Sequence, residues 1–481
     1  MSTTQSDRPE VPQPNRQLVF LIEEAHLSHY ELARLVREAL TRRGLPAKCT
    51  HHNVRRWCEG RATRAVPPYV IAEVLSGRLG REVTPWDIGL AGTGRRRPAG
   101  AATLLDSPAE ITATARAMWA GDLGDADSLQ LNLPAPALAA PALRWLVASA
   151  PFGPAGTGRP DSPVVTDAAV DNIRYQSLFF DTLAQRQGGG AARASAVQYL
   201  HTHLGPLLSG RYDVTTGRDL FDAAALATWT TARHTADTPL HGWSRRYFVL
   251  ALSMAHQAGD RLLGAQILVS LASHLLSTYD FGPAFDLIRA AQLAVERDGS
   301  PAFAELFAVE AQAHTEKGDE TATLLALTAA EKALEAAPGG HQPEWLTFGA
   351  GDLAAVRARC LLVLGRFTEA AQAAEEALDR LPVGQVRGRT IARLLLGSAL
   401  SRLGQRQGAA DAVAEALVQA DGLASHLVGV HLDIAAHHLQ DARGGQGDGS
   451  EALIGRLRAA AARLTRPHQP PASNSCAYRS A

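Results

Sequence analysis

Cysteine is scarce in this chain of 481 residues, which has only Cys49, Cys58, Cys360 and Cys476. Four scattered cysteines cannot form the disulfide framework of a small secreted protein. They favour a reducing compartment, so we expect a cytoplasmic protein. Residues 1–14 are polar, contain proline and lack the apolar segment of a signal peptide. No apolar run approaches the length that crosses a bilayer, so we expect no membrane partner.

The motifs that accompany common enzymatic chemistry are also missing. The glycines of residues 153–158 do not lead into the Gly-Lys-Ser/Thr ending of a phosphate loop, and Gly188-Gly189-Gly190 is followed by Ala-Ala-Arg. There is no His-Glu-x-x-His sequence and no Gly-x-Ser-x-Gly elbow. We therefore expect neither an enzyme nor a cofactor.

Cys49, His51, His52 and Cys58 could suggest a metal site. Their spacing does not match the paired ligands of common zinc sites. On a helix, Cys58 would lie on the apolar side and His52 on the opposite side. We expect no metal here.

Charge, by contrast, is distributed unevenly along the chain. The formal net charge is −1, but residues 1–100 sum to +6 and the remainder to −7. Between Arg34 and Arg64 there are nine Lys/Arg and only two Asp/Glu. A basic segment on a mildly acidic body is typical of a nucleic-acid-binding domain joined to a part with another role.

The basic segment lies within residues 15–92, which read as a helix-turn-helix domain with an enlarged turn. We expect helices over 16–25, over 29–40 behind a Ser28 cap, and from Thr50 through Glu59, where Gly60 ends the helix. Pro67-Pro68 opens a fourth helix through residue 79, and Thr84-Pro85 opens a short fifth.

The third of these helices is the candidate recognition helix. Spacing places Val54, Trp57 and Cys58 inward and the polar residues outward. Arginine can bind guanine with two hydrogen bonds, asparagine can pair with adenine, and helix N-termini and flanking arginines can contact phosphates. The candidate DNA-contacting residues are Ser28, Thr50, His51, His52, Asn53, Arg55, Arg56, Arg61 and Arg64. A solvated basic face is the alternative interpretation.

The rest of the chain predicts helices and no strands. Residues 93–165 are rich in Gly, Pro and Ala, and we expect a linker with short helices near 107–120 and 140–150. Residues 166–465 repeat a helical hairpin with glycine at the turn and alanine where helices approach closely, most clearly around Gly365 and Gly404. Residues 1–14 and 466–481 are expected to be disordered. The predicted fold is all-α: an N-terminal helix-turn-helix domain followed by a tetratricopeptide-like α-solenoid.

Several motifs also resemble a known family. In the head these are Glu31-Leu32-Ala33-Arg34, Val54-Arg55-Arg56-Trp57 and Ile71-Ala72-Glu73-Val74-Leu75. Further along, Asp171-Asn172-Ile173-Arg174 and Trp243-Ser244-Arg245-Arg246-Tyr247-Phe248 complete the set. The chain resembles actinobacterial regulators that join a Cro/repressor-type helix-turn-helix to tetratricopeptide repeats. The resemblance implies a transcriptional regulator similar to the streptomycete repressors of sporulation and antibiotic production.

Two functions follow as hypotheses. In the first, the chain is a sequence-specific regulator that binds double-stranded DNA through its head. Its repeats would then bind a peptide, protein or small-molecule effector and form a homodimer. In the second, it is a tetratricopeptide interaction adaptor whose head does not bind DNA.

Overall fold

The computed structural model describes residues 15–42, 48–61, 66–79, 83, 88–90, 103–124, 133, 135–149, 156, 158, 160–294, 302–336, 343–441 and 450–465. These segments are helical, and their only β pairing is an isolated bridge between Val164 and Arg211. The expected arm, tail and fifth head helix lie outside the described residues. None of the described helices has the length and apolar character needed to cross a membrane.

The head contains the four helices expected within it: α1 (Arg16–Glu24), α2 (His29–Arg42), α3 (His51–Cys58) and α4 (Pro68–Leu79). They enclose a core of their own, in which Leu18, Leu32, Val54 and Ile71 are almost inaccessible to water. The side chain of Asn15 accepts a hydrogen bond from the Leu18 amide and donates one to the Ile88 carbonyl. It therefore joins the start of the head to its end.

Residues 103–149 differ from the expected linker. The two short helices are present as α5 (Pro108–Leu123) and α6 (Ala139–Val147), the second preceded by the 3-10 turn η2 (Ala135–Leu138). They do not form a spacer, because Trp119 and Trp145 are fully buried in the largest hydrophobic cluster of the body. Part of the Pro and Ala content lies within the helices themselves, as at Pro108, Pro141 and Ala142.

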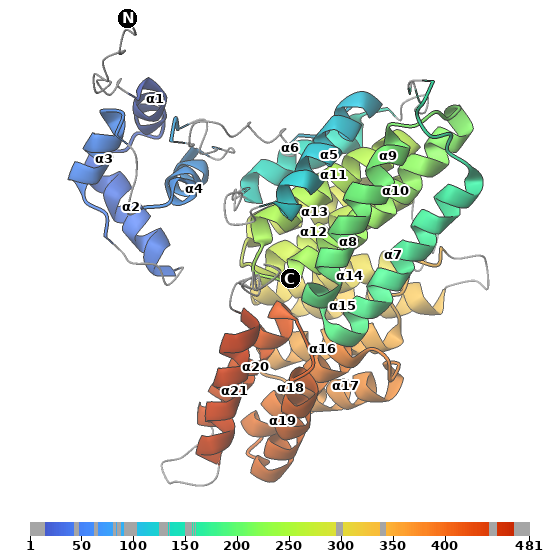
Figure 1. The fold of residues 1–481 in the computed structure, drawn as a ribbon. Helices are drawn as coiled ribbons and strands as arrows, with labels where there is room; N and C mark the ends of the chain where they lie inside the picture. The colour runs from blue at the N-terminus through green and yellow to red at the C-terminus, as the bar shows by residue number, and fades with distance from the viewer. Residues whose placement is uncertain are drawn as a thin grey trace, which may run out of the picture.

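The body continues as helical hairpins (Figure 1). In chain order its helices are α7 (Asp167–Gln187), α8 (Gly189–Tyr199) with the π-helical turn η3 (Leu200–Leu204) and α9 (Gly205–Leu208), α10 (Val214–Ala236), α11 (His241–Ala258), α12 (Arg261–Ser277), α13 (Phe281–Ala294), α14 (Ala302–Glu316), α15 (Glu320–Glu335), α16 (Ala350–Val363), α17 (Phe367–Arg380), α18 (Val386–Arg402), α19 (Arg406–Ala420), α20 (His426–Asp441) and α21 (Ser450–Thr465).

The glycines expected at the hairpin turns adopt the backbone conformation that such turns require. Gly259, Gly318, Gly365 and Gly404 have φ between 73° and 80°, a region that side chains with a Cβ rarely occupy. The looser turn expected near Asp280 instead uses Tyr279, at φ 62°. A common turn conformation explains why the hairpins follow one another with similar geometry.

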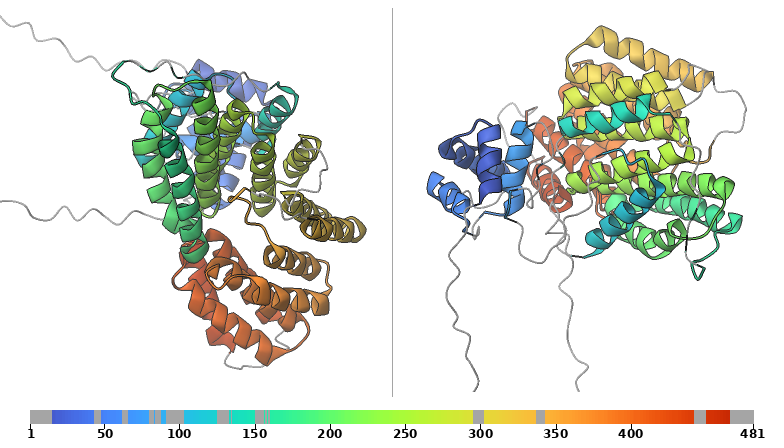
Figure 2. Two further views of the ribbon diagram at one scale, coloured as in Figure 1. Left: turned by 90° about the vertical axis from the view of Figure 1, so that its right-hand side faces the viewer. Right: turned by 90° about the horizontal axis from the view of Figure 1, so that it is seen from above.

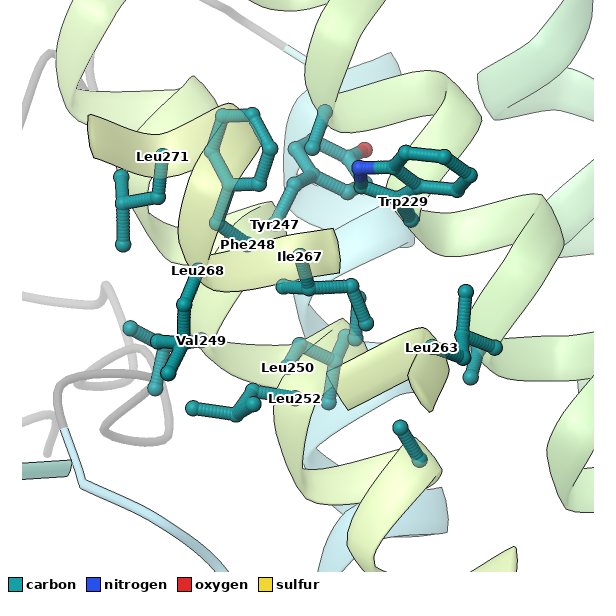
Figure 3. Packing of buried hydrophobic residues seen from close by; sticks show 14 of the residues in the cluster. Trp229, Tyr247, Phe248, Val249, Leu250, Leu252, Leu263, Ile267, Leu268 and Leu271 are labelled. Atoms are coloured by element: carbon teal, nitrogen blue, oxygen red, sulfur yellow. The ribbon is translucent and has the colours of Figure 1, made fainter. Parts of the chain in front are cut away.

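Part of the body core lies between α10, α11 and α12 (Figure 3). Trp229 from α10, Tyr247 and Phe248 from α11, and Ile267 from α12 are each no more than 2% exposed. Alanines on α10 and α11 are also buried, which lets these helices approach closely.

The first helices of successive hairpins form an inner layer. In this layer α10 contacts α12, α12 contacts α14, α14 contacts α16, and α16 contacts α18. Helix α7 contacts both α10 and α18, so these six helices form a closed circuit. The hairpins curve around the body accordingly (Figure 2). An open solenoid would leave its first and last inner helices apart.

The circuit is closed by backbone contacts at Gly188-Gly189-Gly190. The Gly190 amide donates to the Ala424 carbonyl at 2.9 Å, and the Ala424 amide donates to the Gln187 carbonyl at 2.7 Å. A Cβ on Gly188 would overlap the Ala424 carbonyl, so the close approach itself requires glycine. The triple glycine is therefore a docking point for the C-terminal hairpins.

Asp237 lies beside this docking point and is almost fully buried. Its carboxylate accepts hydrogen bonds from the Gly189 amide, the Ser425 hydroxyl and the Leu427 amide, and it pairs with Arg387 at 3.3 Å. One carboxylate thus joins α8, α18 and α20.

Candidate nucleic-acid interface

Helix α3 has the two faces that the sequence predicts. Val54, Trp57 and Cys58 are buried against the rest of the head, with exposed fractions of 0%, 3% and 9%. Thr50 is the N-cap and Gly60 has φ 83°, so the helix begins and ends where expected. The opposite face points away from the head core.

That opposite face carries His51, His52, Arg55 and Arg56, all exposed. The two imidazole rings lie 4.0 Å apart between centroids. Arg55 donates to Glu59 at 3.0 Å, whereas Arg56 forms no ion pair within the described segments. Among the described residues, Arg56 is therefore the arginine of this face that can approach a phosphate or base without first breaking an ion pair.

The capping residues among the candidates are already engaged. Ser28 forms a reciprocal capping box with Glu31, in which its hydroxyl donates to the carboxylate at 2.7 Å. The Thr50 amide and hydroxyl both donate to the Asn53 side-chain oxygen at 2.8 Å. Pairing with adenine needs that oxygen, so Asn53 would have to leave its cap to read a base.

Of the flanking arginines, Arg61 is exposed and lies 4.0 Å from Glu59. Arg64 lies outside the described residues. Glu59 therefore partly neutralises both Arg55 and Arg61. This competition is not apparent from a count of basic residues.

Sequence reasoning missed Arg37 as a positioning residue. Its guanidinium donates to the Cys49 carbonyl at 2.9 Å and so fixes the chain just before α3. The enlarged turn between α2 and α3 is thus held to α2 at its far end. In the structure Arg37 is half-buried. The available sequence signal for this role was its position one turn after Ala33, on a helix whose inward face is otherwise apolar.

The cysteines and histidines of the head do not converge. Burial raises the pKa of the Cys49 thiol to about 11, and Cys58 Sγ faces His29 Nε2 at 3.8 Å, away from His52. Across the described parts of the chain, no three His, Cys, Asp or Glu side chains form a group that could hold a metal ion.

Residues 18–91 match the family model described as the SP15 N-terminal domain. The matched segment covers the head, from α1 to the residues that follow Gly89. No curated protein and no solved structure matches the chain.

Proposed function

We propose that the chain is a sequence-specific DNA-binding transcriptional regulator of the actinobacterial type, in which the head is a helix-turn-helix domain. Helix α3 would enter a major groove, and the tetratricopeptide-like body would bind an effector and form a homodimer in the cytoplasm. The observation that carries the proposal is the exposed polar face of α3 on a basic head that has its own buried core. A short helix with one buried side and an arginine-bearing free side is the form that groove recognition uses.

The first test is replacement of Arg56 with alanine in the full chain. Operators are first selected from a random duplex library, and binding is then measured by fluorescence anisotropy. We expect a loss of about 1–3 kcal/mol on the selected operator, because a bidentate arginine–guanine contact contributes that much discrimination. Arg456→Ala, an exposed arginine on α21, is the matched control and should leave affinity unchanged.

A second test changes Glu59 to glutamine. Glu59 pairs with Arg55 and lies near Arg61, so its removal frees two cations on the proposed interface. We expect tighter DNA binding and a steeper dependence of affinity on salt, because more phosphates can be contacted. An unchanged affinity and salt slope would mean that this face does not meet DNA.

Glu59 neutralises part of the positive charge of Arg55 and Arg61 on this face. This observation favours one alternative, an interaction adaptor whose head binds no DNA. The adaptor interpretation predicts that no duplex is selected from the library at low ionic strength. It also predicts that neither variant alters any binding to DNA. A selected consensus that depends on Arg56 would exclude it.

A further inference from the structure

The six inner helices each contribute one polar side chain to a common interior. These residues, here called the inner polar cluster, are Asp181 of α7, Arg233 of α10, Gln266 of α12, Glu305 of α14, Asp352 of α16 and Arg387 of α18.

An ion pair, a hydrogen bond and longer-range electrostatic interactions connect these side chains across the circuit. Arg233 pairs with Asp181 at 3.2 Å and also acts on Glu305 and Asp352. Arg387 acts on Asp181 and Asp352, which lie on the two helices, α7 and α16, that flank α18 in the circuit. The side chains of Asp181, Arg233 and Arg387 keep exposures of 13%, 29% and 31%. Water therefore reaches the cluster although helices surround it.

Two buried groups beside the cluster have unused hydrogen-bonding capacity. His234 is 2% exposed, neither ring nitrogen has a hydrogen-bond partner, and its Nε2 lies 3.8 Å from Asp181 Oδ1. Burial lowers its pKa, so the ring is neutral and can both donate and accept. Trp229 Nε1 is also buried without a partner. Buried polar atoms without a hydrogen-bond partner need an explanation, and a ligand that supplies the missing partners is one.

Aromatic rings border the same interior. The Arg233 guanidinium lies 5.0 Å from the centre of the Trp229 ring, and Trp345, from the segment before α16, packs edge-on against Trp229 at 5.7 Å. Trp229 already accommodates one cation on its face, as aromatic rings do in sites for organic ammonium groups.

The charges of the cluster favour a cation. Arg233 is committed to Asp181 and Arg387 to Asp237. Glu305 accepts a hydrogen bond from Gln266, and Asp352 accepts one from the Gly349 amide. Neither of these two carboxyl groups forms an ion pair within the described part of the chain. Positive charge is thus already matched, while two carboxyl groups are not.

We propose that the effector is a small organic cation, bound inside the closed circuit with its ammonium or guanidinium group against Glu305 and Asp352 and its stem beside Trp345. This rests on the proposed function in taking the body as the effector-binding part. It selects a small molecule because the polar groups that would hold the effector lie within the circuit of six contacting helices. The buried His234 ring, whose Nε2 lies 3.8 Å from Asp181, supplies the remaining polar contact.

The protonation of Glu305 provides a signature. Burial is the main cause that raises the pKa of this carboxyl to about 7. Between the ordinary glutamate pKa and about pH 7, Glu305 therefore keeps a proton in the folded state that it loses in the unfolded state. This contribution to stability is full below the ordinary glutamate pKa and is lost as pH rises through about 7. A bound cation would instead favour the ionised carboxylate, so binding should release a proton.

The experiment uses the full chain with agmatine and spermidine as probes, 1,5-pentanediol as the uncharged control and citrate as the anionic control. We expect both cations to raise the melting temperature at millimolar concentration. Calorimetry near pH 7 in buffers of different ionisation enthalpy should report proton release. Glu305→Gln keeps the shape of the side chain and the Gln266 contact, so this variant should fold. It should need at least tenfold more cation for the same rise in melting temperature and should show no proton release.

The opposite results overturn the proposal. These are no shift with either cation, an equal shift with citrate or pentanediol, or a cation shift that Glu305→Gln leaves intact. An extended peptide that binds while both cations fail would assign the effector to another surface. Because none of these measurements uses DNA, failure here leaves the Arg56 test unaffected, and failure of DNA binding leaves the cation result standing.

Discussion

Replacing Trp145 with alanine is expected to lower the free energy of unfolding of the body by about 3–5 kcal/mol, the usual cost of emptying a buried tryptophan site. Trp145 is fully buried although it lies on a nine-residue helix in a Gly/Pro/Ala-rich segment. Its indole packs so closely on α12 that a Cβ at Gly264 would overlap it, and the Arg261 guanidinium lies 4.2 Å from its ring centre.

Denaturation in urea, followed by circular dichroism, measures this loss. Leu143→Ala, on the same helix, is the control, because Leu143 is 55% exposed and should change stability by less than about 0.5 kcal/mol. A spacer between two domains would tolerate both substitutions equally. Small and equal losses of stability in the two variants would therefore show that α6 does not belong to the body core.

The elements predicted well from the sequence are those fixed by local signals. Thr50 and Gly60 delimit α3, and Gly365 and Gly404 mark hairpin turns, because caps and positive-φ positions depend on neighbouring residues alone. The two faces of α3 likewise follow from helical periodicity around Val54.

The placement of α5 and α6 could not be predicted in this way, because it depends on contacts distant in sequence. The Leu105 amide donates to the Ser253 hydroxyl across 148 positions, and Arg245 donates to the Leu133 carbonyl across 112. No local pattern encodes these partners. Closure of the circuit has the same origin, since Asp237 meets Ser425 from 188 positions away.

The sequence predicted which residues form the candidate interface, but not which of their side chains are already engaged in hydrogen bonds or ion pairs. The engagement of Asn53 with Thr50 has a sequence signal, since the two stand three positions apart as in a capping box. The ion pair between Arg55 and Glu59 has one as well, at four positions. The availability of Arg56 depended on the side-chain positions in the folded head.

The second large effect is expected at Asp237. Its replacement by alanine leaves the Gly189 amide, the Ser425 hydroxyl and Arg387 without the buried acceptor that they share. Breaking a buried charged network by removing one partner costs about 3–5 kcal/mol. The cost falls on the contact between α8 and the C-terminal hairpins, so we expect the circuit to open before the body unfolds.

Amide hydrogen exchange distinguishes opening of the circuit from general destabilisation. In Asp237→Ala the amides of Gly190, Ala424 and His426, which bond across the closure, should exchange much faster. The turn at Gly365, remote from the closure, should keep its protection. Asp171→Ala is the control, since this aspartate is 75% exposed and, among the described residues, its ion pair is with Arg174 at 3.4 Å.

If closure is the state that encloses the inner polar cluster, its loss should also weaken cation binding. Asp237 does not belong to the cluster, yet it holds Arg387, which does. Asp237→Ala should therefore reduce the cation-induced rise in melting temperature, whereas Asp171→Ala should not. Faster exchange at the closure together with an unchanged cation shift would show that the interior binds its ligand without the closed circuit. The C-terminal hairpins would then have a role separate from effector binding.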